Sequence, residues 1–104
     1  MTFPKQKPWR SKKYTSAAAG QSCVRCGVSD GTIVPCHYTG LRQHSYGKGT
    51  RIKCSDIALA DLCSVCHIYL DNPTERKSIE RSEDFLHCCL LTQIRRLAAG
   101  VLKT

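Results

Sequence analysis

The sequence has no apolar run near the roughly 18 residues needed to cross a bilayer, which excludes a membrane-spanning protein. Its 104 residues, only 7% of them aromatic, are too few for two independent cores. Four prolines and seven glycines are ordinary amounts, so collagen-like and wholly disordered chains are excluded. What remains is one small soluble domain, and a domain this short needs a cross-link that its eight cysteines can supply.

The first 20 residues lack acidic side chains and any apolar stretch of signal-peptide length. Nothing in them addresses the chain to an oxidising compartment, so we expect a cytoplasmic protein whose cysteines bind metal rather than form disulfides. Basic residues but no acidic residue precede Asp30. We therefore predict a flexible basic arm over residues 1–20 and a folded domain over residues 21–104.

The charge of the chain is strongly one-sided. Its formal net charge is +8 at pH 7 and its pI is about 9.3, a balance typical of proteins that bind nucleic acid. Four zinc-bound thiolates would change this charge to +6 and leave its sign unaltered. Lys12 and Lys13 in the arm can follow phosphates, and Trp9 or Tyr14 can stack on an exposed base. A solubilising tail is the alternative interpretation of the same arm.

Turn residues and alternating hydrophobicity predict a β-hairpin in the first half of the domain. Residues 32–37 favour a strand, and Pro35 restricts that strand to an edge of the sheet. The glycine-rich residues 38–50 predict a loop, after which residues 51–53 are expected to return as the second strand.

Helical spacing dominates the second half. Apolar residues within 57–70 predict a helix that covers at least the region from Cys63 onward. A charged, solvated segment is expected over residues 74–81, followed by a last helix that begins at Ser82. Gly100 has the place of a left-handed cap at the end of that helix. Together these elements predict a small α+β fold.

Two CxxC pairs predict a structural zinc site. The pairs are Cys23–Cys26 on a turn and Cys63–Cys66 at the start of a helix, and four sulfur ligands suit tetrahedral Zn²⁺. A closed four-sulfur site has no open coordination position, so it stabilises the fold and does no chemistry. Free core cysteines or an iron–sulfur centre are the alternatives. The other four cysteines are Cys36 and Cys54, which have no assigned role, and Cys88 and Cys89, which are expected to be buried small hydrophobes.

Two histidines lie next to the predicted strand and the second CxxC pair. His37 ends the predicted first strand and His67 directly follows the second CxxC pair, so the zinc site would bring both imidazoles to one cleft. One neutral imidazole can take a proton from water and another can bind a divalent metal, which are the two tasks of phosphodiester hydrolysis. A histidine beside zinc cysteines also often lies at the surface or orients a ligand, and this alternative stays open.

A wider pattern of motifs carries a family resemblance. It consists of residues 17–23, Val34-Pro35-Cys36-His37 with Thr39-Gly40-Leu41, Gly47-Lys48-Gly49 leading to Asp56, Cys63-Ser64-Val65-Cys66-His67 with Asp71, and Leu91-Thr92-Gln93 with Gly100-Val101-Leu102-Lys103. This pattern resembles the zinc-stapled HNH nucleases of the His-Me finger group, and more narrowly the small prophage-encoded YbcO-like nucleases. The resemblance implies a ββα-metal, treble-clef-like core with an additional C-terminal helix.

The resemblance also implies roles for individual residues. His37 would be the general base that activates water, and His67 would bind the catalytic Mg²⁺ or Mn²⁺. Asp56 falls near the HNH asparagine, where a carboxylate could orient His37 or join the metal site. Asp71, one helical turn after His67, could reach the same metal or be a surface residue.

Two departures from the family pattern affect the metal site. Many HNH enzymes have an acidic metal ligand before the base histidine, whereas here that neighbour is Cys36. An aspartate, Asp56, also replaces the usual asparagine. Arg42, Lys48 and Arg51 in and after the glycine-rich loop are candidate phosphate contacts, and His44 is either a further contact or an ordinary loop residue.

The sequence therefore predicts a metal-dependent DNA endonuclease that recognises DNA shape rather than base sequence. The resemblance implies a phage or prophage protein of the bacterial cytoplasm that acts in recombination or DNA processing on branched or single-stranded DNA. Recombination proteins and a second copy of the chain are further candidate partners. The alternative is a zinc-stapled nucleic-acid-binding module without chemistry, and a zinc-dependent docking protein is a weaker third hypothesis.

Overall fold

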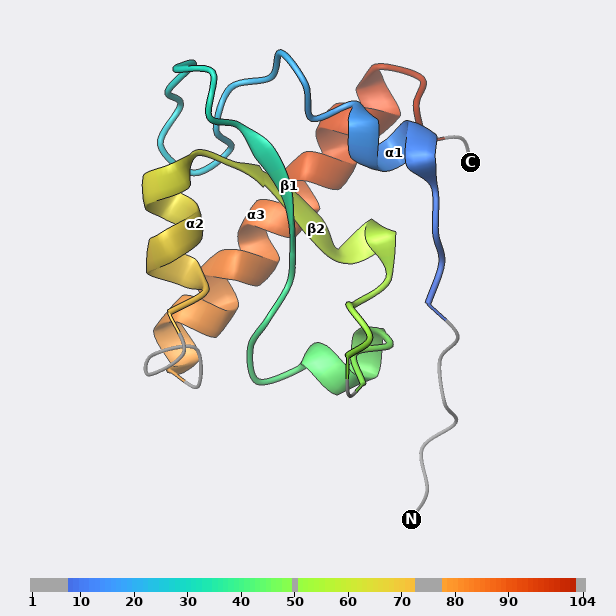
Figure 1. Cartoon of the computed structure of the whole chain (residues 1–104), viewed down its shortest axis with the longest axis vertical. Coiled ribbons are helices and arrows are strands. Elements are labelled where there is room, and N and C mark those ends of the chain that lie inside the picture. Colours follow the sequence, from blue (N-terminus) through green and yellow to red (C-terminus); the bar gives the residue numbers. More distant parts are fainter. Residues whose placement is uncertain (1–7, 50, 73–77, 103–104) are drawn as a thin grey trace.

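A computed structural model describes residues 8–49, 51–72 and 78–102, and in this part of the chain three α-helices surround a small sheet (Figure 1). The elements are α1 (Lys12–Ser16), β1 (Val34–His37), β2 (Leu59–Leu62), α2 (Ser64–Leu70) and α3 (Ile79–Ala98), with short 3₁₀ helices at Gln43–Tyr46 and Asp56–Ala58. This content confirms a small α+β fold. None of the helices in the described ranges is long and apolar enough to cross a membrane.

The sheet pairs β1 with β2 in antiparallel register, from Val34 opposite Leu62 to His37 opposite Leu59. The predicted second strand at residues 51–53 is therefore wrong, because Ile52 forms only an isolated bridge with Gly49. All four residues of β2 are buried, between β1 and α3. A short apolar run buried in this way has the same spacing as a buried helix, which explains why residues 57–62 suggested helix. Pro35 lies in an edge strand, as expected.

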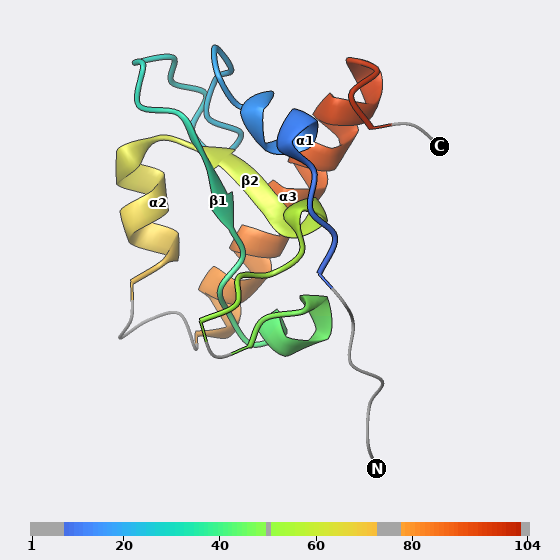
Figure 2. The ribbon, with the colours of Figure 1, turned by 45° about the vertical axis from the view of Figure 1, so that its right-hand side comes forward.

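Helix α3 lies across the sheet and supplies much of the core (Figures 1 and 2). It begins at Ile79, with Ser78 as its N-cap, so the predicted start at Ser82 is wrong. Ser82 is buried instead, and its Oγ bonds to the Tyr38 hydroxyl at 2.5 Å and accepts from the Leu41 N–H. Residues 73–77 of the predicted solvated segment lie outside the described residues. The predicted end is confirmed, since Gly100 follows α3 with φ of 74°.

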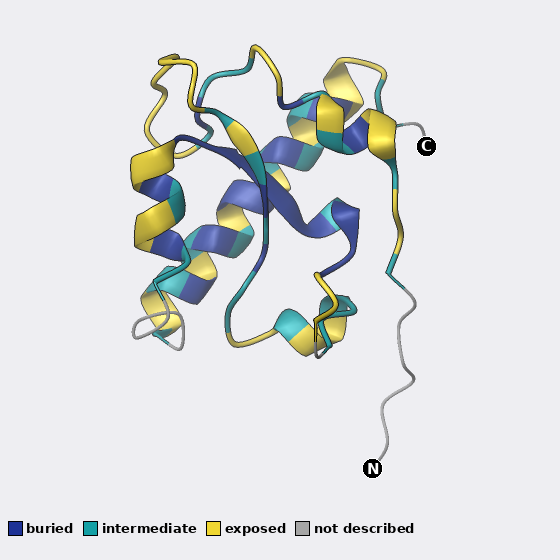
Figure 3. Ribbon diagram, in the orientation of Figure 1, coloured by how far each residue is buried: buried dark blue, intermediate teal, exposed yellow. Residues whose placement is uncertain are grey.

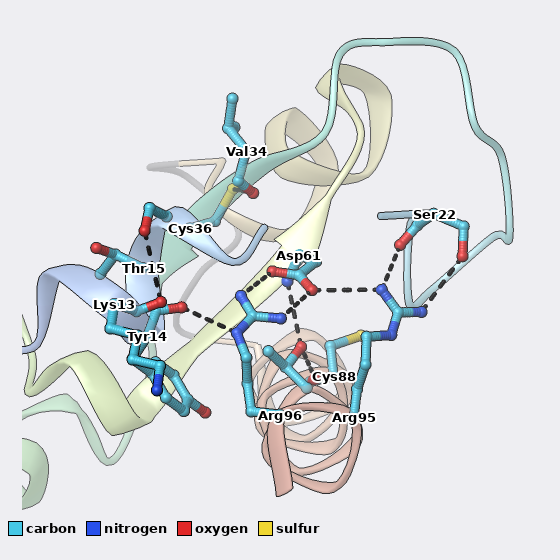
Figure 4. A network of polar contacts seen from close by, with 12 residues as sticks. Lys13, Tyr14, Thr15, Ser22, Val34, Cys36, Asp61, Cys88, Arg95 and Arg96 are labelled. Carbon is cyan, nitrogen blue, oxygen red and sulfur yellow. Dashed lines mark hydrogen bonds and ion pairs between the residues drawn. The ribbon is translucent and has the colours of Figure 1, made fainter. Parts of the chain in front are cut away.

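A buried ion pair joins β2 to α3 (Figure 4). The Arg96 guanidinium donates to both oxygens of Asp61, at 2.7 and 2.6 Å, and both side chains are almost fully buried. Arg96 Nε also donates to the Tyr14 carbonyl at 2.9 Å, which fixes α1 to the same pair. Figure 3 shows β2 coloured as buried along its length, and Asp61 and Arg96 are 0% and 1% exposed.

The described part of the N-terminal segment is folded, so the prediction of a flexible arm over residues 1–20 is wrong from Pro8 onward. Residues 12–16 form α1, Ser11 caps that helix, and Tyr14 is fully buried. Residues 9–11 bond to Ser55 and Asp56. The segment was expected to be free because its basic residues suggest solvation, whereas its folding depends on contacts with distant parts of the chain. Residues 1–7 lie outside the described residues.

Candidate functional site

Four cysteines form a candidate metal centre at one end of the sheet. The sulfur atoms of Cys23, Cys26, Cys63 and Cys66 all lie within 4.8 Å of one another. Cys26 Sγ and Cys63 Sγ are 3.7 Å apart, and two sulfurs of a tetrahedral zinc site with 2.3 Å bonds would be about 3.8 Å apart. The cluster is therefore compatible with structural zinc, as the two CxxC pairs predict.

Backbone N–H groups favour the thiolate form of one of these four cysteines, Cys23. Gly27 N–H donates to the Cys23 carbonyl in a tight turn, and the Cys63 side chain caps α2. Burial raises the pKa of the Cys23 thiol, but backbone N–H groups of Cys26, Cys63 and Arg25 outweigh it and lower that pKa to about 6. A thiol with this pKa is a thiolate at neutral pH, which is the form that binds zinc.

Arg25 supports the cluster from outside. Its Nη1 donates to Cys66 Sγ at 3.6 Å and its Nε donates to Asp84 on α3 at 2.8 Å. A cation beside a thiolate stabilises the negative charge of the sulfur. Because Asp84 lies on α3, Arg25 also links the four-cysteine cluster to the helix that supplies much of the core.

The second feature of interest is a histidine–aspartate pair where β1 ends. His37 Nε2 lies 2.7 Å from Asp56 Oδ1, and both side chains are largely buried. β1 positions the histidine at its last residue, and the 3₁₀ helix Asp56–Ala58 positions the aspartate just before β2. The structure thus brings together the two residues predicted to be catalytic.

The N-terminal segment completes the surroundings of this pair. Ser11 N–H donates to Asp56 Oδ2 at 2.7 Å, and Arg10 Nη1 donates to Asp56 Oδ1 at 3.1 Å. Burial by itself raises the pKa of Asp56, but the bonds from His37, Ser11 and Arg10 outweigh it and hold the pKa below its usual value. Asp56 is therefore a carboxylate at neutral pH and accepts hydrogen bonds only.

A cavity of about 520 Å³ opens beside the pair. It is lined by His37, Asp56, Ile52 and three cationic side chains, Arg10, Arg51 and Lys53. Arg51 has φ of 61°, a left-handed conformation that is uncommon for a residue with a side chain. The cavity therefore combines a base–carboxylate pair with positive charge, a combination that suits a phosphate group.

His67 on α2 and Asp71, the C-cap of this helix, form a separate pair. His67 Nε2 lies 3.7 Å from Asp71 Oδ2, and Thr39 Oγ1 donates to Asp71 Oδ1 at 2.5 Å. The Thr39 contact joins the end of α2 to the chain that leaves β1. Within the described ranges, the four cysteines are the only group of three or more metal-ligating side chains, so a divalent ion here would have two protein ligands.

Burial also accounts for the four other cysteines, Cys36, Cys54, Cys88 and Cys89, which are all buried. The expected burial of Cys88 and Cys89 is confirmed. Burial raises the pKa of Cys36 to about 12, and its Sγ lies 3.4 Å from the Val34 carbonyl. Cys36 therefore stays a neutral thiol beside His37 and does not replace the acidic metal ligand of the HNH pattern.

The predicted phosphate contacts do not all lie at one place. Arg51 lines the cavity beside His37, whereas Arg42 lines a different cavity with Leu41 and Ile79. Lys48 is half-buried, with its Nζ on the Gly49 carbonyl. Lys12 and Lys13 are exposed on α1.

Arg10, Ser11 and Lys53 were not predicted as site residues. The apolar side chains of Trp9 and Tyr14 within the basic segment were the available signal that it packs against the domain.

Comparison with family models, with curated proteins and with solved structures finds no match to this chain. The function is therefore argued from the site itself.

Proposed function

We propose that this protein is a metal-dependent DNA endonuclease of the zinc-stapled HNH type, similar to the YbcO-like prophage nucleases. The observation that carries the proposal is the 2.7 Å contact between His37 Nε2 and Asp56 Oδ1 beside a cavity with three cationic side chains. A base held by a carboxylate and a cationic cavity are what hydrolysis of a phosphodiester requires.

His37 is the general base of the proposed reaction. Because Asp56 is ionised and accepts only, it favours the tautomer with the proton on His37 Nε2 and leaves the lone pair on Nδ1. Nδ1 then takes a proton from the water that attacks phosphorus. Arg10, Arg51 and Lys53 bind the non-bridging oxygens of the scissile and flanking phosphates, and the bond from phosphorus to the leaving oxygen breaks.

His67 and Asp71 would hold the catalytic Mg²⁺ or Mn²⁺. Magnesium commonly takes one or two protein carboxylates, with waters and phosphate oxygens as its other ligands, so two protein ligands are sufficient. Such an ion supplies charge stabilisation at the scissile phosphate and the leaving oxygen. The bond from Thr39 supports this assignment because it orients the Asp71 carboxylate.

The order of elements also supports the HNH type. His37 ends β1, Asp56 precedes β2, and Cys63, Cys66 and His67 follow at the start of α2. This is the order in which ββα-metal enzymes place their base, their polar residue and their metal ligand. From the family resemblance we also propose action on branched or single-stranded DNA during phage recombination in the bacterial cytoplasm, with recombination proteins or a second copy of the chain as partners.

Plasmid nicking tests the proposal. Zinc-loaded protein is incubated with supercoiled plasmid and a branched oligonucleotide, with Mg²⁺, with Mn²⁺ or without divalent metal. We expect metal-dependent nicking that falls by about 10²- to 10⁴-fold in His37→Ala, since removal of a general base has this effect. His87→Ala is the matched control, because His87 is exposed on α3 and does not line the cavity beside the pair.

Zinc content and circular dichroism of both variants show whether the fold is retained. Equal nicking by His37→Ala and wild type would contradict the proposal. DNA binding without cleavage under either metal would favour the alternative of a non-catalytic binding module.

A further inference from the structure

Trp9 is an exposed aromatic side chain fixed next to the histidine–aspartate pair. Its backbone N–H donates to Ser55 Oγ at 3.0 Å, and its carbonyl accepts from the Asp56 N–H at 2.8 Å. Two hydrogen bonds of its backbone therefore hold Trp9 against Ser55 and against Asp56, the residue that binds His37. Its side chain is nevertheless 44% exposed.

The indole ring of Trp9 packs edge-on against one other aromatic ring. Its ring centroid lies 5.5 Å from that of Tyr14, at an interplanar angle of 73°, and Tyr14 is fully buried. Arg10, the next residue, donates to the carbonyls of Lys53 and Cys54 and so fixes the backbone that follows. The result is an exposed aromatic ring on a backbone that is bonded to residues of the cationic cavity.

Other aromatic side chains of the described residues do not offer such a surface. Tyr14, Tyr38 and Phe85 are fully buried. Tyr69 is 39% exposed, but the guanidinium groups of Arg25 and Arg81 lie over its ring at 4.4 and 4.1 Å. Tyr46 is half-buried, and its ring packs edge-on against that of Tyr38, with the centroids 5.7 Å apart. Trp9 is thus the aromatic residue that combines exposure, fixation and proximity to the site.

We infer that Trp9 stacks on an unpaired base of a nucleotide next to the phosphate bound in the cavity, and that it makes the site selective for single-stranded DNA. A base within a duplex is stacked on its neighbours and cannot offer its face to an indole, whereas every unpaired base can. The cationic residues bind the backbone of either form, so the indole supplies the discrimination. This inference rests on the proposed function, because it names the substrate class of the same site.

Tryptophan fluorescence gives a direct test, because the chain contains a single tryptophan. Wild-type protein is titrated without divalent metal, so that no DNA is cut, with a thymine oligonucleotide, with a duplex of equal length, and with an oligonucleotide carrying abasic positions. We expect saturable quenching by the single strand and much less by the duplex or the abasic strand. Equal quenching by all three, or none by the single strand at saturation, would overturn the inference.

Binding affinity provides the second readout. Trp9→Ala is expected to bind the single strand about 5- to 150-fold more weakly, with little change for the duplex, whereas Trp9→Phe retains most of the preference. An unchanged ratio of single-strand to duplex affinity in Trp9→Ala would overturn the inference. The fluorescence test uses only the wild-type chain, so it stands if a variant fails to fold.

Failure of the two proposals gives different results. If wild type nicks DNA in a His37-dependent manner but shows no single-strand quenching, the substrate assignment is wrong and the nuclease stands. If the single strand quenches Trp9 but no metal supports cleavage, base stacking stands and the nuclease is wrong.

Discussion

Asp56 and Asp61 are two buried carboxylates on the same short segment, yet their surroundings differ. Asp61 is bonded to Arg96 and Arg95, has no solvent exposure, and joins β2 to α3. Asp56 is bonded to a histidine ring and lies beside an open cavity. Burial and an arginine partner are therefore common to a structural ion pair and to a candidate catalytic pair. The Asp56 pair differs in two respects: its partner, a histidine, is titratable, and an open cavity gives a substrate access to it.

The comparison also extends to how each carboxylate is anchored. The Asp61 carboxylate accepts from the guanidinium of Arg96 on α3, and the Asp61 N–H donates to Thr92 Oγ1. Asp56 accepts from Arg10, whose side chain is 46% exposed, and from the backbone of Ser11. Loss of Asp61 would leave a buried charge without a partner, whereas loss of Asp56 leaves partners that water can reach.

The largest effect on stability is expected for Asp61→Asn. Breaking a buried ion pair from one side costs about 3 to 5 kcal/mol, because the Arg96 charge remains buried and uncompensated. Urea unfolding at fixed zinc concentration measures this change. The double variant Asp61→Leu with Arg96→Met is expected to recover part of the loss. A cost near zero for Asp61→Asn would show that water reaches the pair and would remove the contrast with Asp56.

Asp56→Ala is expected to affect activity more than stability. Alanine offers no acceptor to fix the tautomer of His37, so nicking should fall by about 10²-fold while zinc content and the circular dichroism spectrum are retained. Asp56→Asn keeps an acceptor oxygen for the His37 ring and should retain most of the activity. The measurement is the nicking rate at saturating Mg²⁺, beside that of Asp61→Asn corrected for its folded fraction. Full activity in Asp56→Ala would show that Asp56, like Asp61, has only a structural role.

The features that could be predicted from the sequence are those set by local spacing. The two CxxC pairs, Pro35 in an edge strand and the glycine that ends α3 each depend on a few neighbouring residues. The pairing of His37 with Asp56 was expected only through the family resemblance. The HNH assignment and the catalytic metal remain predictions.

The features that could not be predicted depend on contacts between distant residues. Tyr14 is buried because Arg96, near the other end of the chain, lies over its ring and binds its carbonyl. Leu59–Leu62 forms a strand rather than a helix because β1 and α3 cover it, which its apolar spacing alone does not reveal. The contribution of Arg10 and Ser11 to the site follows from the same folding of the N-terminal segment.

A third prediction uses the dependence of stability on acid pH to test the lowered pKa of Asp56. The pKa of Asp56 lies below its unfolded value of about 3.9, so its contribution to stability is complete above about pH 5 and declines as pH falls through the folded pKa. The stability difference between wild type and Asp56→Asn should therefore shrink below about pH 4. Protonation of the zinc thiolates affects both proteins alike, so the difference isolates Asp56. A constant difference between pH 7 and pH 3 would contradict the lowered pKa.

The smallest effect is expected within the Asp61 pair itself. Arg95 also contacts Asp61, at 3.3 Å, but its side chain is 27% exposed and water can replace it. Arg95→Ala should cost about 1 kcal/mol or less, whereas Arg96→Ala should cost about 3 to 5 kcal/mol because it leaves Asp61 buried and ionised. Thermal unfolding of the two variants at equal zinc concentration checks the order. Equal losses would mean that the contacts of Arg95 with Ser22, next to the metal centre, matter as much as the buried pair, because those contacts hold the first cysteine turn against α3.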